Sequence, residues 1–231
     1  MNPNQLAFGF IEYVVFLLST TCHEAAHAFV ALRGGDPTAY EGGQVSLSPV
    51  PHIRREPFGM VIMPLLGIAM GTGLIGWASA PYNLLWSQRY PKRAAWMALA
   101  GPATNFLLAS LAGITMKVGL LAGVFVLDTT PGPGIVTANT GGVPDGIAAV
   151  LGVFFTLNIL LGCFNLLPFP PLDGYGVLGL FTSERMALRL QEWRIQFRAF
   201  TIIGLMLGWR MLDYVYDPIM DRALRLFGLY N

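Results

Sequence analysis

Apolar residues along this chain fall into long runs that are separated by shorter, more polar connections. Four of the runs are long enough to cross a bilayer, because a membrane-spanning helix needs about 20 mainly apolar residues. These runs cover residues 8–32, 94–116, 147–168 and 199–216. Backbone groups in lipid must be hydrogen-bonded within the chain, which an α-helix achieves. The pattern therefore predicts an all-α polytopic membrane protein with about four full transmembrane helices.

A fifth apolar run, residues 58–80, is long enough to span but is interrupted by proline and glycine. The connections 33–57, 81–93 and 169–198 are basic, whereas 128–146 has no Lys or Arg. Basic connections accumulate on the cytoplasmic side of a membrane. All three basic connections fall on that side only if 58–80 enters the membrane and returns. We therefore expect 58–80 to form a re-entrant or broken hairpin, which is allowed at depth where protein covers it.

Two shorter segments carry patterns of their own. Gly42-Gly43 is a turn signal, and the alternating residues 44–48 that follow are typical of a strand. We therefore expect a short surface β-hairpin near residues 40–50. Residues 184–198 are amphipathic and rich in arginine, which favours a helix at the cytoplasmic interface. No internal repeat or low-complexity linker divides the sequence, so residues 1–231 are expected to form a single domain.

Composition agrees with a membrane protein. Charged residues make up 12% of the chain, against about 25% in ordinary soluble domains, and hydrophobic residues reach 54%. The formal net charge of +1 gives no indication of a nucleic-acid partner. The lipid bilayer is the partner that this composition predicts.

The first apolar run contains the sequence His23-Glu24-Ala25-Ala26-His27. On a helix, residues four apart share one face, so both imidazoles can reach one metal ion. Glu24 lies close to that face, where it can take a proton from a metal-bound water. Ionisable groups are costly at membrane depth, so they are candidates for function. The alternative is a soluble zinc-binding helix, or two histidines that simply hydrogen-bond in a core.

A catalytic zinc usually has three protein ligands and an open position, so a third ligand is needed. The candidates outside the motif are Asp173, Glu56, His52 and the more remote acidic residues. We favour Asp173, because it follows the apolar run 147–168 and so arrives at a depth similar to that of the two histidines. An ordinary Asp-Gly turn would explain the same residue.

Three motifs occur in this order: residues 23–27, Ala-Gly-Pro-Ala-Thr-Asn at 100–105, and Asn-Leu-Leu-Pro-Phe-Pro-Pro-Leu-Asp-Gly at 165–174. Together they resemble the signature motifs of the site-2 protease family of intramembrane zinc metalloproteases. Residues 46–53, Ser-Leu-Ser-Pro-Val-Pro-His-Ile, resemble its small prokaryotic branch. The resemblance covers about residues 8–180. Relatives commonly carry Asp-Pro soon after Pro-His-Ile, where this chain has Arg54-Arg55-Glu56-Pro57, so no role is carried over to that loop.

The resemblance implies one Zn²⁺ per chain, held by His23, His27 and Asp173, with Glu24 as general base. It implies hydrolysis of a peptide bond in or near a transmembrane segment of a membrane-protein substrate. The catalytic core would cover about residues 8–180, and residues 184–231 would add the amphipathic stretch and a last helix. The expected location is a prokaryotic cytoplasmic membrane, with the active site towards the cytoplasm.

Three other polar residues, Asn105, Asn165 and His52, each have two possible roles. Asn105 and Asn165 could bind the unwound substrate backbone, or they could form interhelical hydrogen bonds. His52 could contact substrate or lie at the membrane interface. A catalytically silent zinc-binding scaffold and a metal transporter are the alternative functions. Three histidines and no repeat argue against a transporter, and an intact Glu24 argues against a scaffold. The sequence leaves the oligomeric state open.

Overall fold

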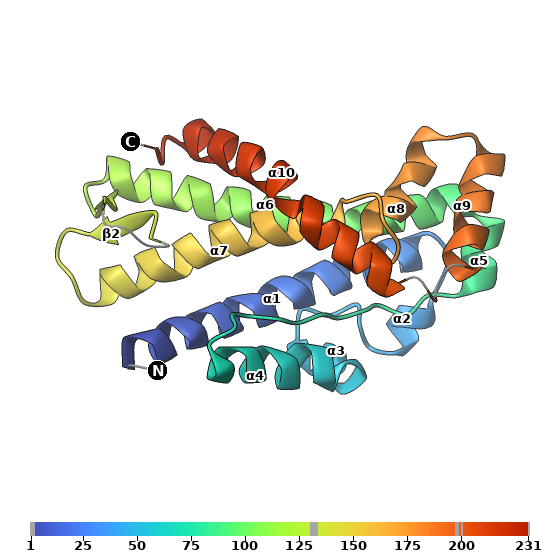
Figure 1. Cartoon of the computed structure of the whole chain (residues 1–231), viewed down its shortest axis with the longest axis horizontal. Helices are drawn as coiled ribbons and strands as arrows, with labels where there is room; N and C mark the ends of the chain where they lie inside the picture. Colours follow the sequence, from blue (N-terminus) through green and yellow to red (C-terminus); the bar gives the residue numbers. More distant parts are fainter. Residues whose placement is uncertain (1–2, 130–133, 197–198, 200, 231) are drawn as a thin grey trace.

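The computed structural model describes the chain except for residues 1–2, 130–133, 197–198, 200 and 231. Helices make up most of the described structure, and one two-stranded sheet accompanies them (Figure 1). The elements are α1 (Pro3–Arg33), α2 (Thr38–Glu41), α3 (Pro49–Arg55), the π-helix η1 (Phe58–Ile62), α4 (Met63–Met70), α5 (Leu84–Arg89), α6 (Pro91–Leu121), β1 (Phe125–Leu127), β2 (Val136–Ala138), α7 (Val143–Asn165), α8 (Asp173–Val177), the 3-10 helix η2 (Leu178–Phe181), α9 (Glu184–Gln196) and α10 (Thr201–Phe227).

Three long helices, α1, α6 and α7, form the centre of the molecule. Each packs against the other two, and they run side by side along its longest axis (Figure 1). Within the described residues, three helices are long and apolar enough to cross a membrane: Gln5–Arg33, Pro91–Leu121 and Val143–Asn165. Three of the predicted spans are thereby confirmed, and the chain is an integral membrane protein.

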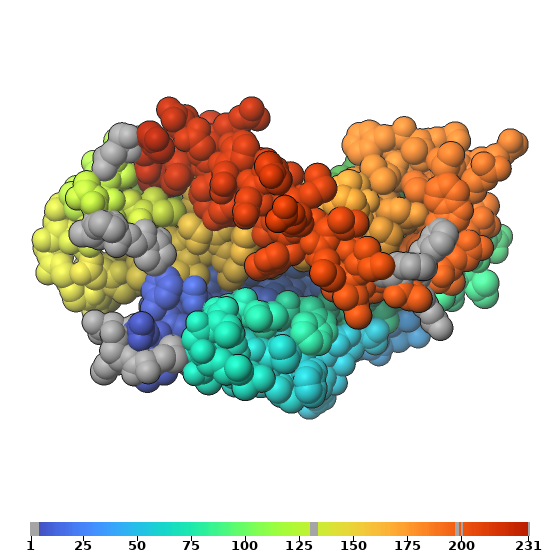
Figure 2. Space-filling view, viewed as in Figure 1, coloured from blue at the N-terminus to red at the C-terminus, as the bar shows by residue number. Residues whose placement is uncertain are grey.

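The fourth predicted span, residues 199–216, differs from the prediction. A helix forms there, α10, but it is not among the described helices that are apolar enough to span. Arg210, Asp213 and Asp217 lie within about two turns of one another and lower its mean hydropathy. The helix lies across α7 (Figure 2) and reaches the segment before α8, where Gly204 meets Pro170. The described residues thus contain three candidate spans where the sequence predicted about four.

Residues 58–80 form the expected broken hairpin. The helical part, Phe58–Met70, has 13 residues and reaches about 20 Å, too short for a hydrocarbon core of about 30 Å. It ends at Gly71, whose φ of 70° is the left-handed conformation that glycine tolerates. The chain then returns along its own helix, and Trp77 N donates to the Gly59 carbonyl at 3.1 Å. A Cβ at Gly59 would lie 2.3 Å from Trp77 O, so glycine permits this close return.

The predicted β-hairpin near residues 40–50 is wrong. Residues 38–41 form α2, and α3 begins at Pro49, with the Ser48 side chain accepting from Val50 N at 3.4 Å. Proline favours the first turn of a helix and cannot donate to a strand ladder. Pro49 and Pro51 therefore favour the helix over the short alternation that precedes them.

The strands lie instead in the connection between α6 and α7. β1 and β2 pair antiparallel, with Phe125 opposite Ala138. Asp145, in the first turn of α7, accepts hydrogen bonds from Thr137 Oγ1 and Ala138 N, both at 2.8 Å. This carboxylate joins the small sheet to the start of α7.

The amphipathic stretch 184–198 is helical as α9 up to Gln196, and its last two residues lie outside the described part of the chain. Arg185 and Arg189 are exposed, whereas Ala187 and Gln191 are buried. Arg194 donates from Nη2 to the Pro171 carbonyl at 3.1 Å. The helix therefore supports the loop that leads into α8.

Candidate metal centre

The two motif histidines lie together in the second half of α1. His23 and His27 are both buried, and their Nε2 atoms are 3.0 Å apart. The rings meet edge to face, with centroids 4.6 Å apart. The four-residue spacing places both side chains towards α6, where they meet Gly101.

Asp173 is brought to the same point from the far end of the sequence. It is the first residue of α8, and its Oδ2 lies 3.1 Å from His23 Nε2 and 3.2 Å from His27 Nε2. The chain folds back over the end of α7 here, and a Cβ at Gly174 would lie 2.1 Å from Leu166 O. Glycine after Asp173 is thus needed to present the carboxylate.

These three residues form a group with the geometry of a metal site, whereas Glu56 and His52 do not belong to it. Ligand atoms of a tetrahedral zinc with bonds of about 2.0–2.1 Å lie about 3.3 Å apart. The three atoms here are separated by 3.0 to 3.2 Å. A Cβ at Gly101 would lie 2.4 Å from both Nε2 atoms, so the absence of a side chain there keeps space beside the ligands. The residues present fit zinc.

The outer nitrogens of both rings are already hydrogen-bonded. His27 Nδ1 lies 2.7 Å from the Met97 carbonyl oxygen, and His23 Nδ1 lies 2.5 Å from Asn105 Oδ1. A carbonyl oxygen can only accept, so the Nδ1 atoms donate and the Nε2 atoms keep their lone pairs. Two imidazole lone pairs and a carboxylate oxygen therefore converge on one point, an arrangement that a cation stabilises.

The Asp173 carboxyl is held in its ionised form. Burial opposes the charge, but when the adjacent imidazoles are protonated, the positive charges of His27 and His23 outweigh burial and hold the pKa of Asp173 below its ordinary value. An ionised carboxylate is the form that ligates zinc.

Glu24 is 5% exposed and directly follows His23 on α1. Within the described part of the chain, no donor is hydrogen-bonded to its carboxylate. A buried carboxylate beside two metal-ligand candidates, with free acceptor positions, is suited to receive a proton.

The three auxiliary candidates, Asn105, Asn165 and His52, have different surroundings in the structure. Asn105 is fully buried behind His23. Asn165 Nδ2 donates to Leu161 O of its own helix at 3.0 Å. His52 is 1% exposed, and its Nε2 lies 3.0 Å from Ser46 O. Only Asn105 is brought to the metal centre.

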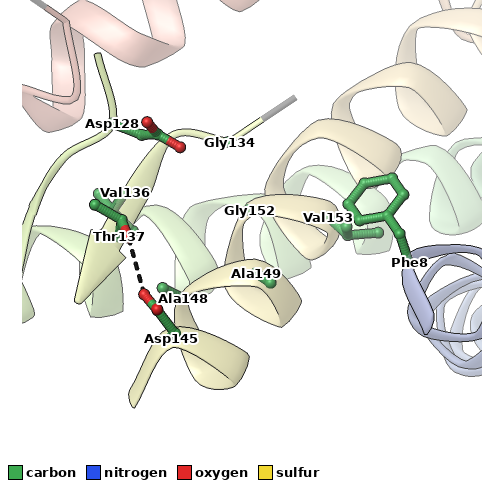
Figure 3. Close-up of a pocket in the computed structure, with 10 residues that line it drawn as sticks. All are labelled: Phe8, Asp128, Gly134, Val136, Thr137, Asp145, Ala148, Ala149, Gly152 and Val153. Atoms are coloured by element: carbon green, nitrogen blue, oxygen red, sulfur yellow. Dashed lines mark hydrogen bonds between the residues drawn. The ribbon is translucent and has the colours of Figure 1, made fainter. Parts of the chain in front are cut away.

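A separate hollow lies at the other end of the molecule, beside the β1–β2 sheet (Figure 3). Asp128, Thr137 and Asp145 contribute its polar atoms, and Phe8 of α1 closes one side. The hollow contains none of the motif residues, and its Asp145 carboxylate is engaged by Thr137 and Ala138. It is therefore not part of the metal centre.

Sequence reasoning did not identify Gly101 or the Met97 carbonyl, both of which contact the histidines. Met97, Gly101 and Asn105 are spaced four residues apart, so they share one face of α6. The four-residue spacing of these residues on a second apolar helix, which must pack against the His-Glu-x-x-His helix, is the sequence signal that could have identified them.

A metal centre of this geometry, built between membrane-spanning helices, defines a metallopeptidase embedded in the membrane. The family model for peptidase family M50 matches residues 11–207. The chain therefore belongs to this family, the site-2 protease family, and is a zinc metalloprotease. The resemblance seen in the three motifs is confirmed.

Two curated relatives are similar over most of the chain. One, from Bacillus subtilis (strain 168), bears the name "Putative zinc metalloprotease YwhC"; it is 31% identical over 220 residues, covering 93% of this chain and 90% of that protein. Another, "Putative zinc metalloprotease Rip2" of Mycobacterium tuberculosis (strain ATCC 25618 / H37Rv), is 34% identical over 184 residues, covering 77% of this chain and 60% of that protein. No solved structure matches the chain.

Proposed function

We propose that this protein is an intramembrane protease that hydrolyses a peptide bond in or near a transmembrane segment of a membrane-protein substrate. His23, His27 and Asp173 hold the zinc ion, and Glu24 is the general base. The observation that carries the proposal is the convergence of three ligand atoms within 3.2 Å of one another, beside a buried glutamate. Two of the ligands stand on a helix able to span the membrane.

When bound, zinc lowers the pKa of a water molecule to about 7 and polarises the scissile carbonyl. Glu24 takes a proton from the attacking water, whose oxygen bonds to the carbonyl carbon. Glu24 then gives that proton to the departing amide nitrogen as the C–N bond breaks. The Nδ1 hydrogen bonds of His23 and His27 hold both rings in place throughout.

The substrate class follows from the location of the centre. Peptide bonds in a transmembrane helix are engaged in intrahelical hydrogen bonds, so the substrate must unwind locally before attack. The unwound groups need new partners in a low-dielectric site. The Asn165 amide stands just before the loop that carries Asp173, and it is partly exposed. We include it as a substrate contact.

We propose that the metal centre lies towards the cytoplasmic side. Arg33 ends α1, and Lys92 and Arg93 begin α6, so basic residues flank the half of the bundle that holds the centre. The sheet end, residues 128–146, has no Lys or Arg. Basic residues favour the cytoplasmic side, and the bacterial sources of the relatives agree with a prokaryotic membrane.

The test is cleavage of a model transmembrane substrate by purified protein in detergent, with zinc content measured in parallel. We expect Glu24→Gln to retain zinc and lose cleavage, and Asp173→Ala to lose zinc. Glu12→Gln makes the same change about three turns away on α1, outside the motif, and should cleave normally.

Three results would refute the proposal. If purified wild-type protein contained no zinc, the proposed metal centre would be refuted. If Glu24→Gln cleaved the substrate as fast as the wild type, Glu24 could not be the general base. Zinc binding without cleavage of any transmembrane substrate, unchanged by Glu24→Gln, would favour the scaffold.

A further inference from the structure

A chain of hydrogen bonds runs from one metal-ligand candidate into the packing of three helices. His23 Nδ1 meets Asn105 Oδ1 at 2.5 Å, and Asn105 Nδ2 donates to Asn158 Oδ1 at 2.9 Å. Asn158 Nδ2 then donates to Ser19 Oγ at 2.8 Å. Asn105, Asn158 and Ser19 are all 0% exposed. The chain thereby joins α1, α6 and α7 where they pack together.

One backbone carbonyl fixes the direction of every bond in this chain. Asn158 Nδ2 also donates to Phe154 O at 2.9 Å, and a carbonyl oxygen can only accept. The amide of Asn158 therefore cannot be turned, and its Oδ1 must face Asn105. Asn105 then donates from Nδ2 and has its Oδ1 left for His23. An acceptor at this position requires the proton of His23 on Nδ1.

The proton on Nδ1 determines what His23 offers to a metal. A neutral imidazole carries one N–H and one lone pair, so a proton on Nδ1 leaves the lone pair on Nε2. Nε2 is the atom that faces His27 and Asp173. The opposite tautomer would point an N–H into the metal position and abolish ligation.

Interhelical adhesion alone does not explain this arrangement. Adhesion needs hydrogen bonds between helices. It does not need a fixed donor-to-acceptor direction in those bonds, nor a bond that ends at a metal-ligand candidate. Among the described residues, the side chain of Asn165, on the same helix, bonds only to the Leu161 carbonyl of that helix. Asn158 differs because a backbone acceptor sets its orientation and its other end reaches a residue that contacts His23.

We propose that Asn105 and Asn158 are positioning residues that fix the tautomer of His23, so that its Nε2 lone pair is directed at the metal. This inference rests on the proposed role of His23 as a zinc ligand. Asn105 acts on His23 directly, and Asn158 acts by orienting the amide of Asn105. Partners of metal-bound histidines typically change metal affinity by about 10–100-fold when they are removed.

The decisive comparison uses two substitutions at residue 158. Asn158→Leu removes the acceptor of Asn105 Nδ2, so the Asn105 amide is free to turn and offer N–H to His23. In its neutral form, Asn158→Asp keeps an acceptor oxygen towards Asn105 and supplies an O–H towards Phe154 O. Thr156→Val is the matched control, because its hydroxyl bonds only to carbonyls of α7.

Zinc affinity of the purified protein is measured by competition with a chelator. The histidine tautomers of the zinc-free protein are measured by ¹⁵N NMR, at a pH high enough for both imidazoles to be neutral. We expect Asn158→Leu to lose about 10–100-fold in zinc affinity and to shift His23 towards the Nε2–H tautomer. Asn158→Asp and Thr156→Val should keep both properties close to those of the wild type.

An unchanged tautomer and an unchanged affinity in Asn158→Leu would overturn the proposal. If Asn158→Asp and Thr156→Val lost as much zinc affinity as Asn158→Leu, the proposal would also be overturned, because a general disturbance of packing would then be the cause. If Asn158→Leu does not fold, Asn105→Leu and Asn105→Asp carry the same comparison, since only the acid retains an acceptor for His23. The tautomer is read without zinc or substrate, so failure of the proposed protease activity remains distinguishable.

Discussion

At Gly101, the addition of a single methyl group should greatly weaken zinc binding and leave the protein folded. It lies inside α6, buried against the two histidines. Alanine is more favourable than glycine in a helix interior by about 0.8–1.0 kcal/mol. Gly101→Ala should therefore leave the helix intact, and any loss must come from the contacts of the new Cβ.

Those contacts can be worked out from the structure. The Cβ would lie 2.4 Å from Nε2 of both His23 and His27, whereas ordinary van der Waals contacts begin at 3.4 Å. The two nitrogens are 3.0 Å apart, so an ion about 2.05 Å from each would lie within about 3.3 Å of the methyl carbon. Relief requires the rings to retreat by about 1 Å, half the length of a zinc–nitrogen bond of about 2.0–2.1 Å.

We expect Gly101→Ala to lose at least 100-fold in zinc affinity, which is about 2.8 kcal/mol, together with all measurable cleavage. Zinc affinity is measured by chelator competition in detergent, and folding by the helical circular dichroism of the same sample. Gly152→Ala on α7 is the matched control, because the nearest atom to its Cβ would be 3.9 Å away. Wild-type zinc affinity in Gly101→Ala would show that the ligand atoms are not those assigned here.

Two further predictions concern the third ligand and the metal itself. Gly204→Ala places a Cβ 1.7 Å from Pro170 O, so it should displace the loop before Asp173 and lower zinc affinity at least tenfold. Gly208→Ala, whose nearest atom is 3.0 Å away at the end of a leucine side chain, should have a much smaller effect; equal effects would contradict this reasoning. Removal of zinc by a chelator should lower the melting temperature, because a ligand at 1,000 times its Kd contributes about 4.1 kcal/mol. Restored zinc should restore it, and an unchanged melting temperature after verified metal loss would refute the prediction.

Features that depend on neighbouring residues in the sequence could be predicted. The spacing of His23 and His27 places them on one helix face in any structure, and the three long apolar runs have no alternative to helices in lipid. Asp173 was predicted from an argument about depth, because α7 must end near the level of the motif, and its carboxylate lies beside both imidazoles. These predictions required no knowledge of which residues pack across the interfaces.

Features that depend on competition between local signals were less predictable. Residues 44–48 alternate like a strand, but five residues do not outweigh prolines at 49 and 51 that favour a helix start. The run 199–216 has the length of a span, but the described helix there, Thr201–Phe227, contains Arg210, Asp213 and Asp217, which lower its mean hydropathy. In the first case residues beside the pattern favoured another structure, and in the second case charged residues within the run lowered its mean hydropathy.

The role of Asn105 shows what only the packing can decide. From the sequence, this amide could equally have contacted substrate or joined two helices. In the structure it does join helices, and we propose that its contact with His23 also selects the nitrogen that His23 presents to the metal. The same face of α6 supplies the Met97 carbonyl to His27 and the open space at Gly101. In the proposed metal centre, α1 and α8 supply the ligands and α6 orients the two imidazoles. Substitutions on α6 should therefore change zinc affinity although α6 supplies no ligand.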